Sequence, residues 1–581
     1  MKLRSFFFTT FIALFAQAAG AQTRPVVNAS TTSLVMSDCA AGSTCTQTFT
    51  LINPQAQAIT IEKVTTYAPV FSVSPATPFS IGANGSQTVT VSFSSTKNLT
   101  YKDIITVEPQ SGVEITEVAL QARAVYNEDY GTKTDYYLGT EDLWGEALKT
   151  KLKSIISNNT NNSYDTSRNA MFGTGVDAID NGNGTKTLEC IYTGRLVTMS
   201  KSTARPSASS PEYINTEHTW PQSKFNEQNP MVSDVHHLFP SDVDANGERS
   251  NFPFGIVNRT DASTRCHDKD VPSQNGTCAN QGSGDWSYLQ NSVYEPRDVQ
   301  KGNTARAMFY FVTRYGDLGS FWSSSMESAF RTWHKNDPPD AKEKARNTGI
   351  MNFQNNRNPY VDHPEFIDRI SLFGGTATGE PSIATPSVVP VSEGYGNVAP
   401  AQQLEAEIDV INRGNAAFTY TTSLSGTGFS IVSGASGTVS AYGVQAVRVR
   451  FSPAALTTYN GILTVTPSTG NAINVILSGM GSTSIPVETE TLPTTFVVDG
   501  AYPNPFQTSG TLRFTLARDA RVRFEMTDVL GRQVVAGWQD VVNAGTHERN
   551  ISGESLPAGL YLYRFTVDGQ TVSGKWVKAG R

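Results

Sequence analysis

One β-rich sequence pattern occurs twice in this 581-residue chain, and it strongly constrains the possible folds. Apolar and polar residues alternate between Gly, Asn and Ser turns over residues 22–125 and again over residues 378–482. Aromatic and turn residues of the first copy return in the second at one constant offset: Phe71, Phe93, Tyr101, Thr106, Val107, Pro109 and Gly112 correspond to Phe429, Phe451, Tyr459, Thr464, Val465, Pro467 and Gly470. Period-two alternation with frequent turns is typical of antiparallel β-sandwiches, and such self-similarity indicates two copies of one module.

The region between the two copies, residues 126–377, has a different composition. Trp, His and other aromatic residues appear, together with helical periodicity over residues 143–158 and 304–334. A chain of this length is too long to fold around one ordinary hydrophobic core. We therefore expect a separate α+β domain here, of a size typical of an enzyme.

The first residues have the features of a secretory signal peptide. A basic start precedes an apolar run from Phe6 to Phe15, and small residues at Ala19 and Ala21 suit cleavage after residue 21. The apolar run is too short to cross a bilayer, and no later segment is long and apolar enough to do so. We predict a signal peptide at residues 1–21 and no transmembrane segment in the mature protein.

The five cysteines fit an exported protein with few disulfides. Cys39 and Cys45 flank a short loop, Cys266 and Cys278 bracket a Gly/Asn-rich loop, and both pairs are predicted disulfides. Cys190 remains as a predicted buried free thiol. No pair has the two-residue spacing of a zinc knuckle, which argues against a cysteine metal site.

Residues 215–255 carry the densest set of chemically active side chains in the chain. Hydrolysis of a phosphodiester needs a base for the attacking water and a cation for the phosphate and the leaving oxygen. Glu217 and the amide oxygen of Asn246 are hard ligands suited to a divalent cation, and His218 is suited to be the base. Adjacent strand residues point to opposite faces, so Glu217 and His218 can share a site only where the strand ends, which Pro221 favours.

Three linked motifs in this stretch resemble the secreted endonuclease I family of bacterial non-specific nucleases, with a His-Me finger (ββα-metal) site. The motifs are EHTWPQS, SDVHHLFPSD and NGERSNFPFG. The likeness extends over most of residues 126–375. It implies that His218 is the general base and that Glu217 and Asn246 hold a single Mg²⁺, with Ca²⁺ and Mn²⁺ as the other ions considered.

The resemblance leaves the cation on the scissile phosphate open. Some family members place an arginine there from an insertion that is short in this chain, where it offers only Lys224. Either Lys224 or Arg249 takes the role, or neither does, and guanidinium geometry favours Arg249. Basic residues also exceed acidic ones between Arg297 and Arg357, so this segment either tracks phosphates or forms a solvated, ion-paired face.

Other polar residues of the region are expected to support the site. His236 and His237 lie in the apolar context VHHLF and are predicted as scaffold, and Asp234 is predicted as a cap or loop carboxylate. No motif of aromatic and basic residues for base readout is present, so little sequence specificity is expected.

The C-terminal segment, residues 493–581, follows a polar linker at residues 483–492. Its motifs YPNPF, DVLGR and LPAGLYLYRF, in that order, are similar to the C-terminal sorting domain of the type IX (Por) secretion system. This resemblance implies export across the outer membrane, followed by removal of the domain or attachment to the surface. The two sandwiches resemble the Ig-like modules often appended to secreted bacterial enzymes.

The sequence therefore predicts a multidomain protein in which an α+β His-Me finger domain is flanked by two all-β Ig-like sandwiches and followed by a β sorting domain. The predicted function is a secreted or surface-bound, monomeric, Mg²⁺-dependent endonuclease that cuts DNA with little sequence specificity and leaves 5′-phosphate ends. RNA is a second substrate considered, and the sequence leaves the preference between DNA and RNA open. The net charge of −7 argues against a chain that binds nucleic acid through bulk positive charge. The alternative is a surface adhesion or DNA-capture protein whose nuclease-like domain does not cut.

Overall fold

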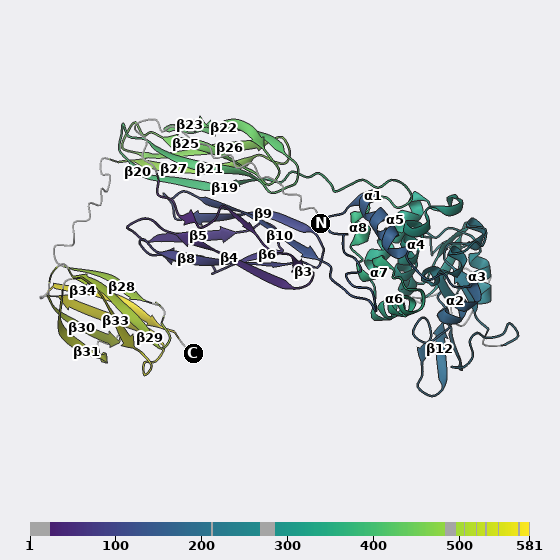
Figure 1. The fold of residues 1–581 in the computed structure, drawn as a ribbon. Helices are drawn as coiled ribbons and strands as arrows, with labels where there is room; N and C mark the ends of the chain where they lie inside the picture. Colours follow the sequence, from purple (N-terminus) through teal and green to yellow (C-terminus); the bar gives the residue numbers. More distant parts are fainter. Residues whose placement is uncertain are drawn as a thin grey trace. The chain divides into compact units, whose positions relative to one another are not determined.

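The computed structural model describes residues 24–210, 213–267, 285–482 and 496–579, the last range without residues 503, 505, 517, 519, 529–531, 544 and 568–569. The predicted signal peptide and linker lie outside these residues. The chain divides into two compact units, Met1–Thr483 and Ser484–Arg581 (Figure 1). Within the described residues, no helix is long and apolar enough to cross a membrane.

The first sandwich packs two sheets against each other around an apolar core. One sheet has the order β1-β4-β8-β6, and the other has the order β2-β10-β9-β5-β7 with β3 also paired to β10. Side chains of β10 alternate between buried and half-buried, as the period-two pattern predicts. The strands are β1 Asn28–Ala29, β2 Ser33–Val35, β3 Cys39–Ala40, β4 Thr44–Ile52, β5 Ile59–Thr65, β6 Phe71–Ser74, β7 Phe79–Ile81, β8 Ser86–Ser94, β9 Thr100–Pro109 and β10 Thr116–Val125.

The second sandwich repeats this architecture with sheets of order β19-β21-β25-β23 and β20-β27-β26-β22-β24. Its core is again made of buried apolar side chains from both sheets. The strands are β19 Pro386–Val389, β20 Ser392–Val398, β21 Leu404–Asn412, β22 Phe418–Ser425, β23 Phe429–Ser433, β24 Ser436–Val439, β25 Val444–Phe451, β26 Thr458–Pro467 and β27 Ile473–Gly481.

The repeated aromatic residues occupy equivalent places in the two sandwiches. Phe71 pairs with Phe93 across β6 and β8, with ring centroids 5.3 Å apart. Phe429 pairs with Phe451 across β23 and β25, with ring centroids 5.0 Å apart. The predicted internal repeat is therefore confirmed at the level of cross-strand pairs, which are the unit of sheet stabilisation.

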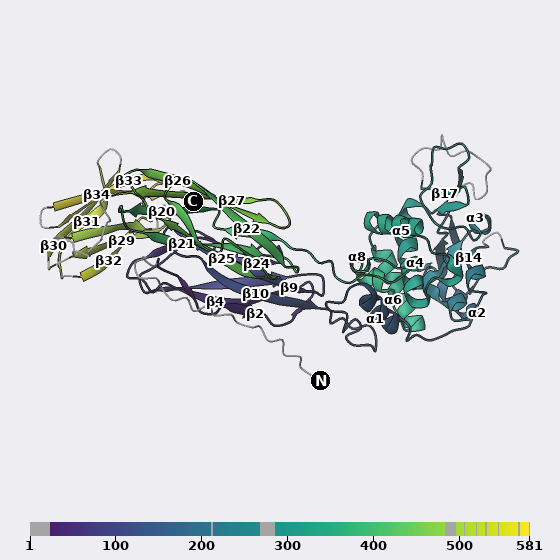
Figure 2. The ribbon, with the colours of Figure 1, turned by 90° about the horizontal axis from the view of Figure 1, so that it is seen from above.

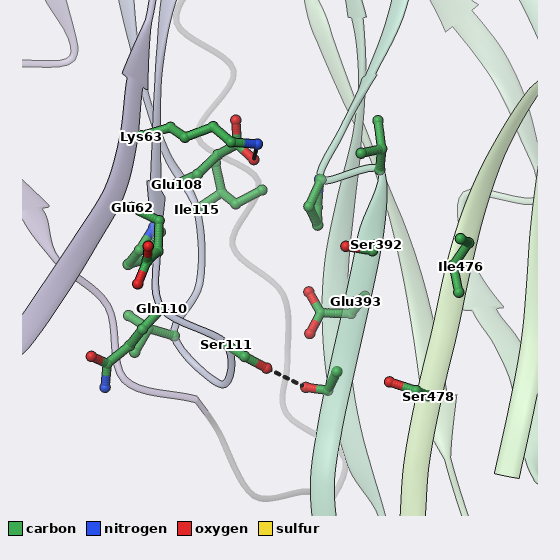
Figure 3. Close-up of a pocket in the computed structure, with 15 residues that line it drawn as sticks. Glu62, Lys63, Glu108, Gln110, Ser111, Ile115, Ser392, Glu393, Ile476 and Ser478 are labelled. Carbon is green, nitrogen blue, oxygen red and sulfur yellow. Dashed lines mark hydrogen bonds and ion pairs between the residues drawn. The ribbon is translucent and has the colours of Figure 1, made fainter. Parts of the chain in front are cut away.

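Contacts between the two sandwiches lie within the first unit. Arg24 and Glu393 form a buried ion pair of 2.7 Å, and the Ser111 hydroxyl donates to the Gly394 carbonyl over 3.1 Å. Figure 3 shows these facing loops and strands around a cleft of about 380 Å³. The polar side chains that line it come from both sandwiches.

The central domain combines short strand pairs with helices around a second large core. Its strands are β11 Ile179–Asp180, β12 Thr185–Glu189, β13 Leu196–Ser200, β14 Asn215–His218, β15 Leu238–Ser241, β16 Arg265–His267, β17 Ser287–Gln290 and β18 Val293–Glu295. Its α-helices are α1 Gly145–Ile156, α2 Tyr164–Met171, α3 Val243–Arg249, α4 Lys301–Tyr315, α5 Ser324–Asn336, α6 Ala341–Gln354, α7 Pro359–Asp362 and α8 Phe366–Arg369. Its 3₁₀ turns are η1 Gln222–Lys224, η2 Met231–Ser233, η3 Val235–His237, η5 Asp298–Gln300 and η6 Leu318–Ser320.

Helix α4 is the centre of this domain and is buried around almost its whole circumference. The predicted helical stretch 304–334 is divided into α4 and α5 because Gly316 adopts a φ of 83° and ends α4. Trp220 stacks on Phe311 of α4 with ring centroids 4.6 Å apart. The segment that follows β14 is thereby anchored to the core.

The C-terminal unit is a β-sandwich, as predicted for a sorting domain. Its sheets have the orders β28-β29-β32 and β31-β30-β33-β34, and Trp576 and Phe565 lie in its core. The strands are β28 Phe496–Tyr502, β29 Ser509–Leu516, β30 Ala520–Asp528, β31 Gln533–Val542, β32 Gly545–Ser552, β33 Gly559–Val567 and β34 Gln570–Lys578.

The cysteines follow the sequence prediction where the structure describes them. Cys39 and Cys45 form a disulfide, and Cys190 is a buried free thiol. Cys266 is disulfide-bonded, while its predicted partner Cys278 lies outside the described residues.

Candidate active site

Two paired strands and one helix carry the predicted site residues. β14 pairs with β15 in antiparallel register, with Glu217 opposite Phe239 and His218 opposite Leu238. α3 follows β15 directly and packs against β14. Figure 2 shows β14, α2 and α3 grouped at one end of the central domain.

The structure brings Glu217, His218, Asn246 and Arg249 together around one open cleft of about 310 Å³. Glu217 and His218 are neighbours on one strand but both line this cleft. The strand ends at His218, and the chain turns at Pro221 into η1. The end of the strand thus removes the alternation of faces that would otherwise separate the two side chains.

Glu217 is a buried carboxylate with two polar neighbours. The Tyr192 hydroxyl donates to its Oε1 over 2.7 Å, and the Arg249 Nε lies 3.2 Å from the same oxygen. Burial raises the pKa of Glu217, and the Arg249 charge and the Tyr192 hydrogen bond oppose this rise. The carboxylate is therefore held in place from the protein side.

His218 is held by hydrogen bonds at both ring nitrogens. Its Nε2 lies 3.1 Å from the carbonyl oxygen of Val232, and its Nδ1 lies 3.0 Å from the Nε2 of Gln222. Because a carbonyl only accepts, Nε2 carries the hydrogen and Nδ1 presents its lone pair to the Gln222 amide. Burial, followed by the neighbouring His237, lowers the pKa of His218 well below its usual value, so the ring is neutral at pH 7.

Asn246 lies in α3 and supplies a second oxygen donor. Its Nδ2 donates to the Thr216 carbonyl over 3.3 Å, which leaves Oδ1 as the acceptor end of the amide. A carboxylate and an amide oxygen on an open cleft fit Mg²⁺, which prefers oxygen ligands and retains several waters. Within the described residues, no cluster of three or more His, Cys, Asp or Glu side chains has the arrangement of a metal site.

Arg249 is committed to the protein in this structure. Its Nη1 donates to the Ser250 carbonyl over 2.8 Å and its Nη2 donates to the Thr219 carbonyl over 2.6 Å. Only 1% of its surface is exposed, and the guanidinium lies over the Phe254 ring. These contacts make Arg249 a support for Glu217, and the contact with the scissile phosphate stays a prediction.

The residues predicted as scaffold do lie around the site as buried supports. His237 Nε2 is 2.7 Å from the Met231 carbonyl oxygen, and its ring meets His218 edge-on at 5.3 Å. His236 Nε2 is 3.3 Å from the carbonyl oxygen of Asn356. Asp234 caps η3 by accepting from the His236 N–H, as its prediction as a cap requires.

The hypothesis that the basic segment between Arg297 and Arg357 tracks phosphates is wrong for most of its members. Five of its arginines are largely buried and paired with carboxylates, most of them from distant parts of the chain. The pairs are Arg297 with Glu189 and Asp285, Arg306 with Glu343, Arg314 with Asp234, Arg346 with Asp177, and Arg357 with Asp362. A count of charges along the sequence does not reveal burial, and these pairs serve the fold.

Three residues near the site were not singled out from the sequence. Gln222 lies four positions after His218, inside the EHTWPQS motif, and that proximity was a usable signal. Tyr192 and Arg168 precede the motifs and reach the site only through the fold. The sequence around them carries no comparable signal.

Comparisons with known proteins agree with this architecture. Residues 144–365 match the family model Endonuclease I, residues 500–579 match the secretion system C-terminal sorting domain, and residues 25–123 match the HYDIN/CFA65/VesB-like Ig-like domain. The extracellular ribonuclease of Bacillus subtilis (strain 168) is 32% identical over 258 residues, which are 42% of this chain and 80% of that protein. An extracellular deoxyribonuclease of Aeromonas hydrophila is 30% identical over 139 residues, which are 24% of this chain and 53% of that protein.

These matches bear on location and on family. A sorting domain of a secretion system, together with extracellular relatives, places the protein outside the cell or on its surface. The match to the Bacillus ribonuclease covers most of that protein, and it coincides with the domain that holds the cleft. By its central domain, the chain belongs to the endonuclease I family.

Proposed function

We propose that this protein is a secreted, metal-dependent endonuclease that hydrolyses phosphodiester bonds of DNA, and of RNA, with little sequence specificity. The observation that carries the proposal is one cleft lined together by His218, Glu217 and Asn246, in which Nδ1 of His218 faces Gln222, another residue of the cleft. Relatives named as a ribonuclease and a deoxyribonuclease support both substrates.

His218 is the proposed general base of a one-metal His-Me finger mechanism. Its ring is neutral at pH 7, so Nδ1 can take a proton from a water that replaces the Gln222 amide. The Val232 carbonyl accepts from Nε2–H and stabilises the imidazolium that forms. The hydrogen bond to this carbonyl therefore fixes the tautomer and the orientation of the His218 ring.

Glu217 and Asn246 are the proposed ligands of Mg²⁺, with Ca²⁺ or Mn²⁺ as alternatives. When bound, the ion neutralises charge on the phosphate and on the departing 3′ oxygen, which leaves a 5′-phosphate end. Tyr192 and Arg249 hold the Glu217 carboxylate from behind. The Thr216 carbonyl fixes the amide of Asn246.

A plasmid-nicking assay tests the proposal. The full chain is expected to relax supercoiled DNA with Mg²⁺ and to stop when EDTA is added. His218→Ala is expected to lower the rate about 10³-fold or more, since general-base catalysis contributes up to about 10⁴-fold. His547→Ala changes a half-buried histidine of the C-terminal unit, outside the central domain, and is expected to leave the rate unchanged.

Two results would count against the proposal. Full activity of His218→Ala, or activity unaffected by EDTA, would exclude the assigned base or the metal. DNA binding without nicking would favour the alternative of a surface DNA-capture protein. The end chemistry is tested separately: 5′-phosphate products are joined by DNA ligase without prior treatment with a kinase.

A further inference from the structure

A cationic side chain on the phosphate, besides the metal, would stabilise the negative charge that grows on its oxygens during the reaction. The two cationic side chains within the motifs, Arg249 and Lys224, make other contacts. Both Nη atoms of Arg249 donate to backbone carbonyls, and the Lys224 ammonium lies over the Phe321 ring. A cation from outside the motifs must therefore be considered.

Arg168 of α2 contacts a residue that lines the same cleft. Its Nε donates to the Thr216 hydroxyl over 3.2 Å, and Thr216 both lines the cleft and directly precedes Glu217. Tyr164 is one helical turn earlier on the same face of α2, and the guanidinium lies 5.3 Å from the centre of its ring. The Tyr164 ring is in turn 5.4 Å from the His218 ring.

The guanidinium of Arg168 is positioned but only weakly paired. Its ion-pair contact within the described residues is to Asp165, at 4.0 Å from Nη1. Asp165 is exposed and forms a shorter pair of 2.6 Å with Arg205. About 22% of the Arg168 side chain is exposed, whereas the Arg249 side chain is almost fully buried.

The Tyr164 ring connects Arg168 to the proposed base, because it contacts both the guanidinium of Arg168 and the ring of His218. Arg168 therefore lies on the side of His218 where a phosphate can approach the attacking water.

We propose that Arg168 contacts a nonbridging oxygen of the scissile phosphate through its Nη atoms, while Nε stays bound to Thr216. The inference rests on the proposed function, which it deepens by assigning the phosphate contact to α2. A guanidinium held at Nε presents its two Nη groups in the fork that matches a phosphate.

The test is single-turnover cleavage of a labelled DNA duplex. Three substrates are compared, in which the scissile phosphate is normal or is one of the two phosphorothioate diastereomers. The variants are Arg168→Ala, Arg168→Lys and Arg168→Gln, all in the full chain with Mg²⁺. Arg205→Ala is the matched control, because Arg205 shares Asp165 with Arg168. Thermal denaturation of each variant reports on folding.

Arg168→Ala is expected to lower the rate about 100-fold, the usual effect of losing one charge-stabilising donor, and Arg168→Lys to recover part of it. The wild-type protein is expected to cleave one phosphorothioate diastereomer more slowly than the other, and loss of Arg168 should shrink that ratio. Arg205→Ala should stay within about twofold of the wild-type rate, because it pairs only at the exposed surface.

The outcomes separate the contact from a structural role and from the proposed function. A slow Arg168→Ala variant with an unchanged diastereomer ratio would show a structural role and overturn the inference. A wild-type rate in Arg168→Ala, with His218→Ala inactive, would overturn the inference and leave the proposed function intact. If Arg168→Ala does not fold, the diastereomer ratios of the Lys and Gln variants decide. Cleavage by His218→Ala, or none by the wild type, would overturn the proposed function itself.

Discussion

The side-chain amide of Gln222 donates to Nδ1 of His218 over 3.0 Å, at the nitrogen that we assign as the proton acceptor. The other nitrogen is independently bound to the Val232 carbonyl, so the ring keeps its orientation without Gln222. The amide is neutral and belongs to a residue that lines the open cleft. An attacking water can therefore displace it, and the amide can then hold that water in place.

We predict that Gln222→Ala lowers kcat about 3- to 10-fold and leaves the fold intact. The variant loses one positioning hydrogen bond, whose net contribution is on the order of 1 kcal/mol. The base itself remains. The measurement is the single-turnover rate of DNA cleavage next to that of His218→Ala.

Ser223→Ala is the control for this change, because Ser223 lines the same cleft without a hydrogen bond to His218. Its rate should match that of the wild type. A Gln222→Ala rate as low as that of His218→Ala would mean that the amide, and not the imidazole alone, is essential for proton transfer.

Tyr192→Phe is expected to weaken metal binding about 10-fold with a smaller effect on cleavage at saturating Mg²⁺. The variant loses the hydroxyl that donates to Glu217. Loss of a hydrogen bond to a metal ligand commonly lowers metal affinity by roughly 10- to 100-fold. The measurement is the Mg²⁺ concentration at half-maximal activity. An unchanged requirement would remove Glu217 from the set of metal ligands or Tyr192 from its support.

Tyr294→Phe is the matched control for Tyr192→Phe. The Tyr294 ring packs 4.8 Å from the Tyr192 ring, so both changes remove a hydroxyl from the same buried cluster. Only Tyr192 donates to Glu217 in the hydrogen bonds of the described residues. The Mg²⁺ requirement should therefore shift for one variant and not for the other.

Much of the candidate site could be predicted because its residues lie in linked local motifs. Glu217 and His218 are adjacent, and Asn246 follows within the same stretch, so spacing along the chain indicated a common site. The same holds for the two sandwiches, where the period-two pattern and the repeat at a fixed offset determine which residues face the core.

Residues that reach the site through tertiary packing could not be predicted in this way. Tyr192 donates to Glu217 from a position 25 residues earlier, and Arg168 bonds Thr216 from 48 residues earlier. The excess of basic residues was misleading for the same reason. Arg314 is counted as a free cation in the sequence, yet it is buried against Asp234, which lies 80 residues away.

The buried pair of Arg249 and Glu217 yields a prediction about stability. Arg249→Met alone is expected to lower the free energy of unfolding by about 3–5 kcal/mol, because it leaves the Glu217 carboxylate buried without its cation. The double variant Glu217→Gln/Arg249→Met is expected to be more stable than Arg249→Met, since the uncompensated charge is gone. Chemical denaturation of the wild type, both single variants and the double variant measures the coupling.

Additive effects in this cycle would contradict a direct interaction between the two side chains. Arg205→Ala serves as the surface control, because Arg205 pairs with the exposed Asp165. Its effect on the unfolding free energy should be below about 1 kcal/mol, as is usual for an exposed ion pair.

The central domain is expected to lose stability as the pH falls from about 6.5 toward about 4. Burial lowers the pKa of His334 to about 4, and the nearby Arg306 and Lys335 charges add to this while Asp368 opposes it. Above pH 6.5 the ring is neutral in both states, so it does not affect stability. As the pH falls, the unfolded chain gains the proton first, and unfolding is favoured.

His334→Gln is therefore expected to reduce the loss of stability between pH 7.5 and pH 5.0 by about 2 kcal/mol, the free-energy equivalent of this pKa difference at pH 5. Denaturant midpoints at the two pH values, followed by tryptophan fluorescence, give the measurement. His547→Gln should leave the loss of stability of the central domain unchanged, because His547 lies in the separate C-terminal unit. An equal loss in wild type and His334→Gln would mean that protonation of His334 is not linked to unfolding. The acid sensitivity would then have to come from other buried groups. One such group is His236, whose pKa burial also lowers to about 4.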